Sequence, residues 1–149
     1  MAPCPGCGLP KGPDACQSLF HELAAVASTD LRFGRYHRQA VDTYCLQHPP
    51  YIASAKSLMA HLGGLCITFE YRNDPAAHSV LLKSLNGKPS LARPAIPKSP
   101  GTITIASVMR PPNAETHAAA VDNWSRAVWE AYTPLHQFAR EWIERAWRR

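Results

Sequence analysis

The chain has 149 residues, a formal net charge of +5 and 46% hydrophobic residues. This length and composition are typical of one globular domain with a real hydrophobic core. The positive charge forms no basic stripe with interleaved aromatic residues, so we expect no nucleic-acid partner. No apolar run could span a bilayer and no apolar signal-peptide core begins the chain, so we expect no membrane partner and a cytoplasmic location.

The N-terminal segment carries the sequence CPGCG at residues 4–8. Two cysteines two residues apart in a Pro/Gly turn are typical of a zinc knuckle, because the turn directs both sulfurs to one point. Cys16 follows closely and is a candidate third ligand. Five cysteines, an odd number, disfavour a disulfide framework and favour a reducing compartment. We therefore predict a Zn²⁺ site that includes Cys4, Cys7 and Cys16.

Helical patterns dominate the first part of the chain after the cysteines. Four helices are predicted, over residues 15–27, 33–48, 53–66 and 75–85. Asp14 can cap the first, and the proline pair after His48 ends the second. Gly63 and Gly64 would permit a close helix crossing in the third. Residues 66–71 fit either a continued helix or a strand.

The rest of the chain is predicted to hold a proline-rich loop and a long helix. Residues 102–109 alternate in hydrophobicity and are predicted to form one short extended segment or strand. Pro111, Pro112 and Asn113 open a helix over residues 114–148, and Pro134 predicts either a kink or two helices end to end.

The fold class is therefore mainly α, with a single domain over residues 1–149. We predict an irregular bundle of five or six helices with an N-terminal zinc knuckle and one short extended segment. Its parts are a zinc-knuckle segment at 1–16, a helical part at 17–87, a Pro-rich loop and short strand at 88–112, and C-terminal helices at 113–149.

The fourth zinc ligand has to come from elsewhere, and the second helix offers two histidines. His37 and His48 share a helix face, but eleven residues separate them by about 16 Å along the axis. One metal ion cannot bind both. The two rank equally as the fourth ligand, ahead of Cys45 and His21, and it is also open that neither binds.

The same helix is unusually polar for one that should pack centrally. One interpretation is structural, with each histidine satisfied by hydrogen bonds. The other is catalytic, and requires polar groups of this helix to converge on a pocket with a histidine from the C-terminal helix. The candidates for such a small-molecule site are His37, Asp42, Tyr44 and His136.

The cysteine pattern and the second helix together resemble a known protein family. The CPGCG sequence, Cys16 before a helix, and the Tyr-x-x-Gln-His-Pro ending at residues 44–49 are similar to an uncharacterised bacterial family, a domain of unknown function. The resemblance spans nearly the whole chain and implies a small cytosolic bacterial protein that binds metal. The predicted function is zinc binding with an unknown activity. The alternative is a small metal-dependent enzyme that acts on a small molecule in a histidine-lined helical pocket.

Overall fold

The computed structural model describes residues 2–87, 90–109 and 113–148, and over these ranges the chain is helical, without strands. The mainly α class is therefore confirmed. The α-helices are α1 (Pro13–Thr29), α2 (Leu31–Gly34), α3 (His37–Gln47), α4 (Ala55–Glu70), α5 (Pro75–Asn86), α6 (Ala114–Ala131) and α7 (His136–Trp147). Three 3₁₀-helices join them, namely η1 (Pro49–Ile52), η2 (Ile105–Val108) and η3 (Thr133–Leu135).

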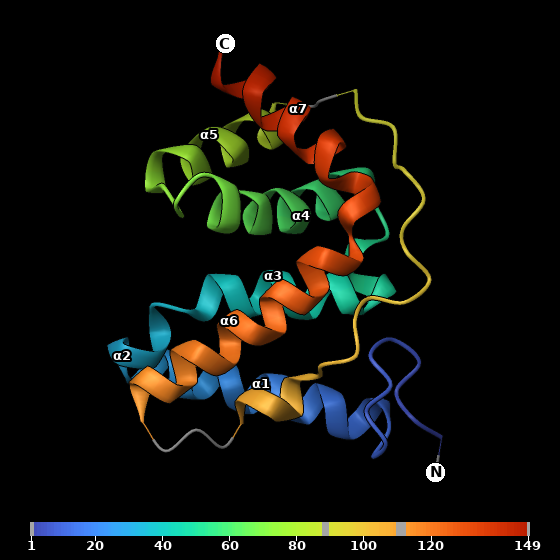
Figure 1. The fold of residues 1–149 in the computed structure, drawn as a ribbon, viewed down its shortest axis with the longest axis vertical. Helices are drawn as coiled ribbons and strands as arrows, with labels where there is room; N and C mark the ends of the chain where they lie inside the picture. The colour runs from blue at the N-terminus through green and yellow to red at the C-terminus, as the bar shows by residue number, and fades with distance from the viewer. Residues whose placement is uncertain (1, 88–89, 110–112, 149) are drawn as a thin grey trace.

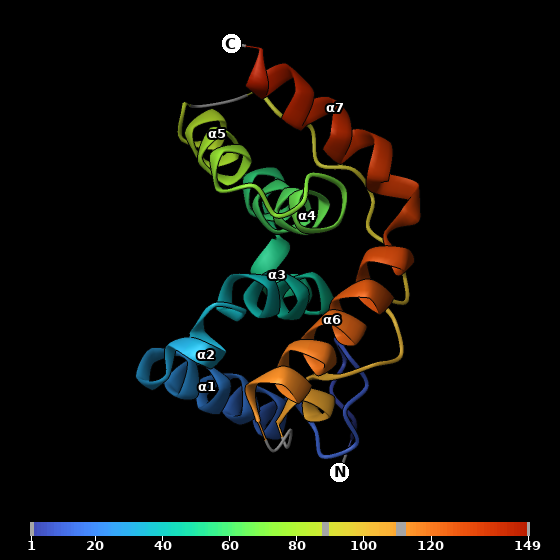
Figure 2. The ribbon, with the colours of Figure 1, turned by 60° about the vertical axis from the view of Figure 1, so that its left-hand side comes forward.

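The helices form two halves that meet where α3 packs on α4 (Figures 1 and 2). We call α1, α2, α3 and α6 the lower half, as oriented in Figure 1, and α4, α5 and α7 the upper half. Helices α6 and α7 run along one side as a bent rod, with α6 against α3 and α7 against α4 and α5. Residues 90–104 run along the same side of the molecule, from the upper half to the lower half.

Three of the four predicted N-terminal helices form close to their predicted places. Pro13 starts α1, as suits a residue without an N–H in the first turn. The cap predicted at Asp14 is wrong, because Asp14 lies inside the first turn and Gly12 is the N-cap, without a side-chain hydrogen bond. Ser54 and Ser57 form a capping box at the start of α4, and the Asp74 side chain accepts the N–H of Ala76 at the start of α5. Helix α4 continues to Glu70, so the ambiguous residues 66–70 are helical.

The single helix predicted over residues 33–48 is wrong, because the chain breaks into α2 and α3. Gly34 ends α2 against the end of α1, where an added Cβ would lie 2.6 Å from the Ala27 carbonyl oxygen. Tyr36 then leaves helical geometry, and α3 begins at His37. This break depends on the packing of α2 against α1, and the apolar periodicity of residues 33–48 gives no information about that contact.

The strand predicted over residues 102–109 does not form, and residues 105–108 make the 3₁₀-helix η2 instead. The Thr104 side chain accepts the Ala106 N–H and caps η2. Ile105 and Val108 stand three residues apart, so they share one side of a 3₁₀-helix and both are buried. The alternation was therefore misleading, because none of the described residues forms a strand with which this segment could pair.

The long C-terminal helix is divided as its proline predicts. Helix α6 ends before Tyr132, η3 contains Pro134, and α7 follows, which confirms two helices end to end. The Asn113 side chain accepts the Thr116 N–H and caps α6. Pro111 and Pro112, which were predicted to open this helix, lie outside the described residues.

The glycine pair of α4 sets the spacing at the centre of the fold. An added Cβ at Gly64 would lie on the Asp42 carboxylate of α3, and one at Gly63 would lie 2.8 Å from the Leu81 side chain of α5. The close crossing predicted for this pair is therefore confirmed. The surrounding core is apolar and fully buried, and includes Leu58, Leu62, Leu65, Ile67, Trp124 and Val128.

Candidate metal centre

The first two cysteines lie in a tight loop ahead of α1. The Cys4 N–H donates to the Leu9 carbonyl at 2.9 Å, and the Gly8 N–H donates to the Cys4 carbonyl at 2.8 Å. Gly8 has a φ of 82°, a left-handed conformation that glycine adopts without strain. The loop therefore folds back on itself and brings the thiols of Cys4 and Cys7 to one side.

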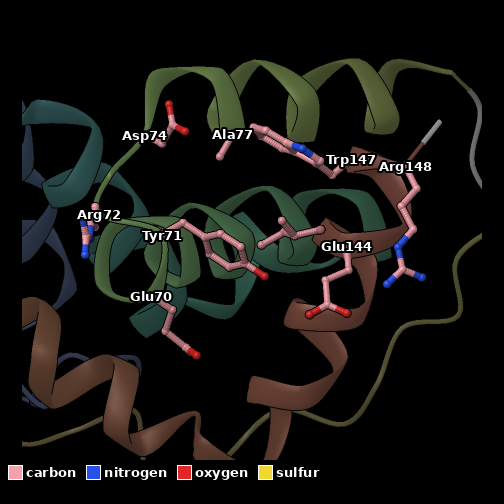
Figure 3. A pocket seen from close by; sticks show the side chains of 9 residues that line it. Glu70, Tyr71, Arg72, Asp74, Ala77, Glu144, Trp147 and Arg148 are labelled. Carbon is pink, nitrogen blue, oxygen red and sulfur yellow. The ribbon is translucent and has the colours of Figure 1, made fainter.

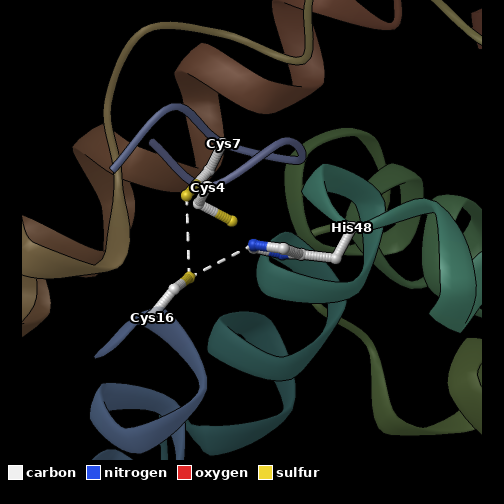
Figure 4. A group of neighbouring side chains, drawn as sticks. All are labelled: Cys4, Cys7, Cys16 and His48. Carbon is white, nitrogen blue, oxygen red and sulfur yellow. Dashed lines mark hydrogen bonds between the residues drawn. The ribbon is translucent and has the colours of Figure 1, made fainter. Parts of the chain in front are cut away.

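Three cysteines and one histidine converge at the end of this loop (Figure 4). The donor atoms of Cys4, Cys7, Cys16 and His48 all lie within 4.8 Å of one another. The Sγ atoms of Cys7 and Cys16 are 3.6 Å apart, and the Cys16 Sγ is 3.3 Å from Nε2 of His48. All four residues are buried, with 0–8% of their surface exposed.

These separations suit a tetrahedral metal ion. Metal–sulfur bonds of about 2.3 Å and a metal–nitrogen bond of about 2.0 Å give ligand–ligand edges of about 3.5–3.8 Å in a tetrahedron. The observed 3.6 Å and 3.3 Å are close to those edges. All five cysteines are free thiols, so no disulfide competes for these sulfurs. The donor set can thus hold a metal with only small side-chain movements.

His48 is oriented for metal binding by the backbone of its own helix. Its Nδ1 lies 2.6 Å from the Tyr44 carbonyl oxygen. A carbonyl only accepts, so Nδ1 carries the hydrogen and Nε2 presents its lone pair to the cysteines. Burial lowers the pKa of His48, partly offset by this hydrogen bond, and so favours the neutral imidazole that metals require.

The thiols differ in how easily they ionise. Burial alone would raise the pKa of Cys4, but hydrogen bonds from the Cys7 and Gly6 N–H groups outweigh it and lower that pKa. Burial raises the pKa of Cys7 to about 12 and also raises that of Cys16. A bound metal cation would stabilise the thiolate forms of these buried cysteines and so offset the cost of ionising them away from water.

Two further residues fit the loop to the end of α3. An added Cβ at Gly6 would lie 2.5 Å from the Gln47 carbonyl oxygen and 2.7 Å from the His48 ring, so glycine allows this contact. Tyr44 stacks between Phe20 and His48, with ring centroids 4.0 Å and 3.9 Å away. Its hydroxyl lies 3.4 Å from the Cys16 sulfur, where it can donate to a thiolate without being a ligand.

Gln47, the glutamine of the Tyr-x-x-Gln-His-Pro sequence, links α3 to two neighbouring segments. The buried Gln47 side chain accepts the Trp124 indole N–H at 3.0 Å and donates to the Ile103 carbonyl at 2.8 Å. It therefore ties both α6 and residues 90–104 to α3. The Tyr132 hydroxyl donates to the Leu46 carbonyl at 2.6 Å and adds a second link.

The other predicted site residues do not join this centre. His37 is half-buried at the opposite end of α3, and its Nδ1 has no hydrogen-bond partner among the described residues. His136 stacks on Trp129 with ring centroids 3.6 Å apart and bonds the Trp129 carbonyl through Nε2. Asp42 faces α4, and only Tyr44 lies beside the cysteines. The catalytic candidates therefore do not converge on one pocket, and His48 rather than His37 lies beside the thiols.

Asp42 has a partner that the sequence analysis missed. Nδ1 of His61 on α4 lies 2.8 Å from an Asp42 carboxylate oxygen. Burial raises the pKa of Asp42 to about 6, although the His61 contact opposes this shift. Burial lowers the pKa of His61, but the Asp42 and Cys45 hydrogen bonds outweigh it and raise that pKa to about 9. His61 precedes Gly64 by one turn of α4, and that spacing was the available signal.

A separate cavity of about 400 Å³ lies in the upper half between α4, α5 and α7 (Figure 3). Tyr71 and Trp147 lie on two of its sides, and Glu144 lies below the tyrosine hydroxyl. Its other carboxylates have structural partners, since Glu70 pairs with Arg140 and Asp74 caps α5. This cavity contains none of the predicted site residues.

Fold and site together define a small helical protein with a buried Cys₃His cluster that can hold a metal ion. Residues 2–133 match the model of the Family of unknown function (DUF5946), and the chain belongs to this family. The matched range contains all four cluster residues and ends at the start of η3. Comparisons with curated proteins and with solved structures give no match. Among the described helices, none has the length and apolarity needed to cross a membrane.

Proposed function

We propose that the chain binds one Zn²⁺ through Cys4, Cys7, Cys16 and His48, and that this zinc is structural. The convergence of four buried donor atoms within 4.8 Å carries the proposal. Three thiolates and one imidazole are a set that zinc favours in tetrahedral structural sites. Free thiols as ligands also fit a reducing compartment such as the cytoplasm.

The proposed zinc would hold the N-terminal loop in place. Of the loop residues before α1, Leu9 is the buried aliphatic one, so little else can anchor the loop by apolar packing. The ligands come from the loop, the first turn of α1 and the end of α3. One ion would therefore connect the loop and the start of α1 to the end of α3, 32 residues beyond Cys16, and its binding energy would contribute to folding.

A structural role is favoured over catalysis at the metal. Catalytic zinc sites keep a position for water or substrate, whereas four protein ligands fill a tetrahedron. The alternative enzyme hypothesis also needs His37, Asp42 and His136 to converge. Asp42 instead contacts His61, and His136 contacts Trp129.

Metal content of the purified protein tests the proposal. Elemental analysis should give one zinc per chain in wild type, a loss in Cys7→Ser and in His48→Ala, and no loss in His37→Ala. The last variant is the matched control, because it removes a histidine from the other end of the same helix. Metal-free wild type, or zinc lost in His37→Ala and kept in His48→Ala, would overturn the proposed ligand set.

A further inference from the structure

A second cavity of about 490 Å³ opens directly beside the candidate metal centre. Among its lining residues, Cys4, Tyr44 and His48 are buried, and we call them the floor of the cavity. Four prolines and Tyr51 also line it, and we call them its walls. We call it the metal-side pocket. Its volume lies within the range of small-molecule sites, and its walls are apolar as in most such sites. The wall prolines are Pro5, Pro13, Pro49 and Pro50.

The charge of the metal-side pocket is opposite to that of the chain. The whole sequence has 16 Lys and Arg residues against 11 Asp and Glu residues. Among the described residues that line the pocket, none is lysine or arginine, and Asp14 is the one carboxylate. Zn²⁺ with three thiolates and a neutral imidazole would leave a net charge of about −1 at the floor. Both features favour a positively charged ligand.

The pocket also offers surfaces for an aromatic ring. The flat faces of the prolines accept apolar rings, and the Tyr51 ring, which is 38% exposed, can interact with a cation through its π face. Tyr51 makes edge contacts with both Phe20 and Tyr44, with ring centroids 6.4 Å and 5.9 Å away, so it is held in place. A rigid wall of this kind costs little side-chain entropy on binding.

We propose that the metal-side pocket binds a small organic cation with an apolar ring, of the arylalkylamine class. The ring would pack between the prolines and Tyr51, and the ammonium group would face Asp14 and the Cys4 sulfur, which line the same pocket. This inference rests on the proposed zinc site, because the site builds the floor of the pocket and supplies part of its negative charge.

Three probes of similar shape and different charge test this proposal. Phenethylamine, phenethyl alcohol and phenylacetate are titrated into zinc-loaded protein, with binding followed by NMR shifts of Gly6 and Tyr51. We expect the amine to bind with a Kd on the order of 1 mM, about three- to tenfold tighter than the alcohol, with the carboxylate weakest. Asp14→Asn should remove most of the amine's advantage, and Tyr51→Ala should weaken both amine and alcohol.

Glu22→Gln is the matched control, because it removes a carboxylate from the exposed face of the same helix, outside the pocket. It should leave all three affinities unchanged. Zinc is measured on every sample. If zinc is present but the amine binds no better than the other probes, or Asp14→Asn has no effect, this inference fails and the zinc site stands. If wild type lacks zinc, the proposed function fails, and this inference fails with it.

Discussion

The N-terminal loop and the upper half are stabilised by different means. In the upper half, α4 buries Leu58, Leu62 and Leu65 completely, and α7 adds Trp142 and Ile143. Apolar burial of this kind contributes about 25 cal/mol per Å² and needs no metal. Among its described residues, the loop before α1 buries only two cysteine side chains and Leu9. Its two thiols lie within 4.8 Å of the donor atoms of Cys16 and His48.

This difference indicates how a metal ion could hold the N-terminal loop, which has too few apolar side chains to stay folded by packing alone. Prolines and glycines give the loop its shape but little apolar surface to bury. A metal ion supplies directional bonds where an apolar core is too small. Removal of the proposed zinc should therefore affect the loop strongly and the upper half weakly. The first two of four predictions test this contrast, and the other two concern the contact between α3 and α4.

Cys7→Ser is expected to have the largest effect. The variant should lose its zinc, and residues 2–12 should lose protection from hydrogen exchange, because structural zinc sites contribute on the order of 10 kcal/mol to folding in small domains. Protection of α4 should be retained. Hydrogen exchange followed by mass spectrometry measures both regions in one sample.

Cys66→Ala is the control for this prediction. Cys66 is also buried but belongs to α4 and is not part of the sulfur cluster. Its zinc content should equal that of wild type. Collapse of exchange protection throughout α4 in Cys7→Ser would refute the proposed independence of the two regions.

Leu62→Ala should show the opposite behaviour. The buried side chain leaves a cavity, which lowers the free energy of unfolding by about 2–5 kcal/mol. Zinc content should not change. Chemical denaturation and elemental analysis check the two quantities, with Leu82→Ala as the control, since that leucine is 45% exposed. Reduced zinc in folded Leu62→Ala would contradict the contrast.

Gly64→Ala should lower stability by about 1–3 kcal/mol through overpacking. An added methyl group would lie on the buried Asp42 carboxylate, so that this side chain, and with it its contact to His61, has to shift. Gly87→Ala is the control, because its nearest contacts lie at 3.8 Å. Denaturation curves compare the two variants, and an equal response would mean that the helix crossing tolerates a side chain at Gly64.

The smallest expected effect is on the titration of His61. Its pKa of about 9 lies above the ordinary 6.5, so its contribution to stability is complete below pH 6.5 and is lost as pH rises through about 9. Asp42, with a pKa raised from 3.8 to about 6, gives a contribution that is complete below pH 3.8 and is lost as pH rises through about 6. Both contributions therefore favour the folded state at lower pH.

NMR titration of the His61 ring measures this directly. Asp42 and Cys45 on α3 face the imidazole, and Arg38 lowers the pKa of Asp42. Asp42→Asn should drop the pKa of His61 by removing its main charged partner. Asp122→Asn, which alters an exposed ion pair on α6, should leave it unchanged. An unchanged His61 titration in Asp42→Asn would show that the pair does not set this pKa.

The three sulfur positions of the candidate site could be predicted, whereas the histidine could not be chosen. The spacing of Cys4 and Cys7 fixes their proximity within one turn. His37 and His48 share a face of the same helix, and only the packing of Gly6 against the end of α3 selects His48. That packing is a tertiary contact between segments about forty residues apart, and no local pattern contains it.

The fold shows the same division between local and long-range information. Apolar periodicity found α1 and α4, and Asp74 and Pro134 correctly placed the start of α5 and the division of the C-terminal helix, because these signals act within a turn or two of the helix. The break after Gly34 and the 3₁₀-helix at Ile105 depend on contact with α1 and α6. His61 was missed because its role depends on a buried carboxylate of another helix.

X-ray absorption at the zinc edge of the purified wild-type protein is the most direct test of the metal centre. The proposed site predicts three sulfur neighbours at about 2.3 Å and one nitrogen neighbour at about 2.0 Å. Both the three sulfur neighbours and the nitrogen neighbour should persist in His37→Ala, whereas His48→Ala should hold no zinc to give a spectrum. A shell dominated by oxygen and nitrogen, or fewer than three sulfur neighbours, would contradict zinc binding by Cys4, Cys7, Cys16 and His48.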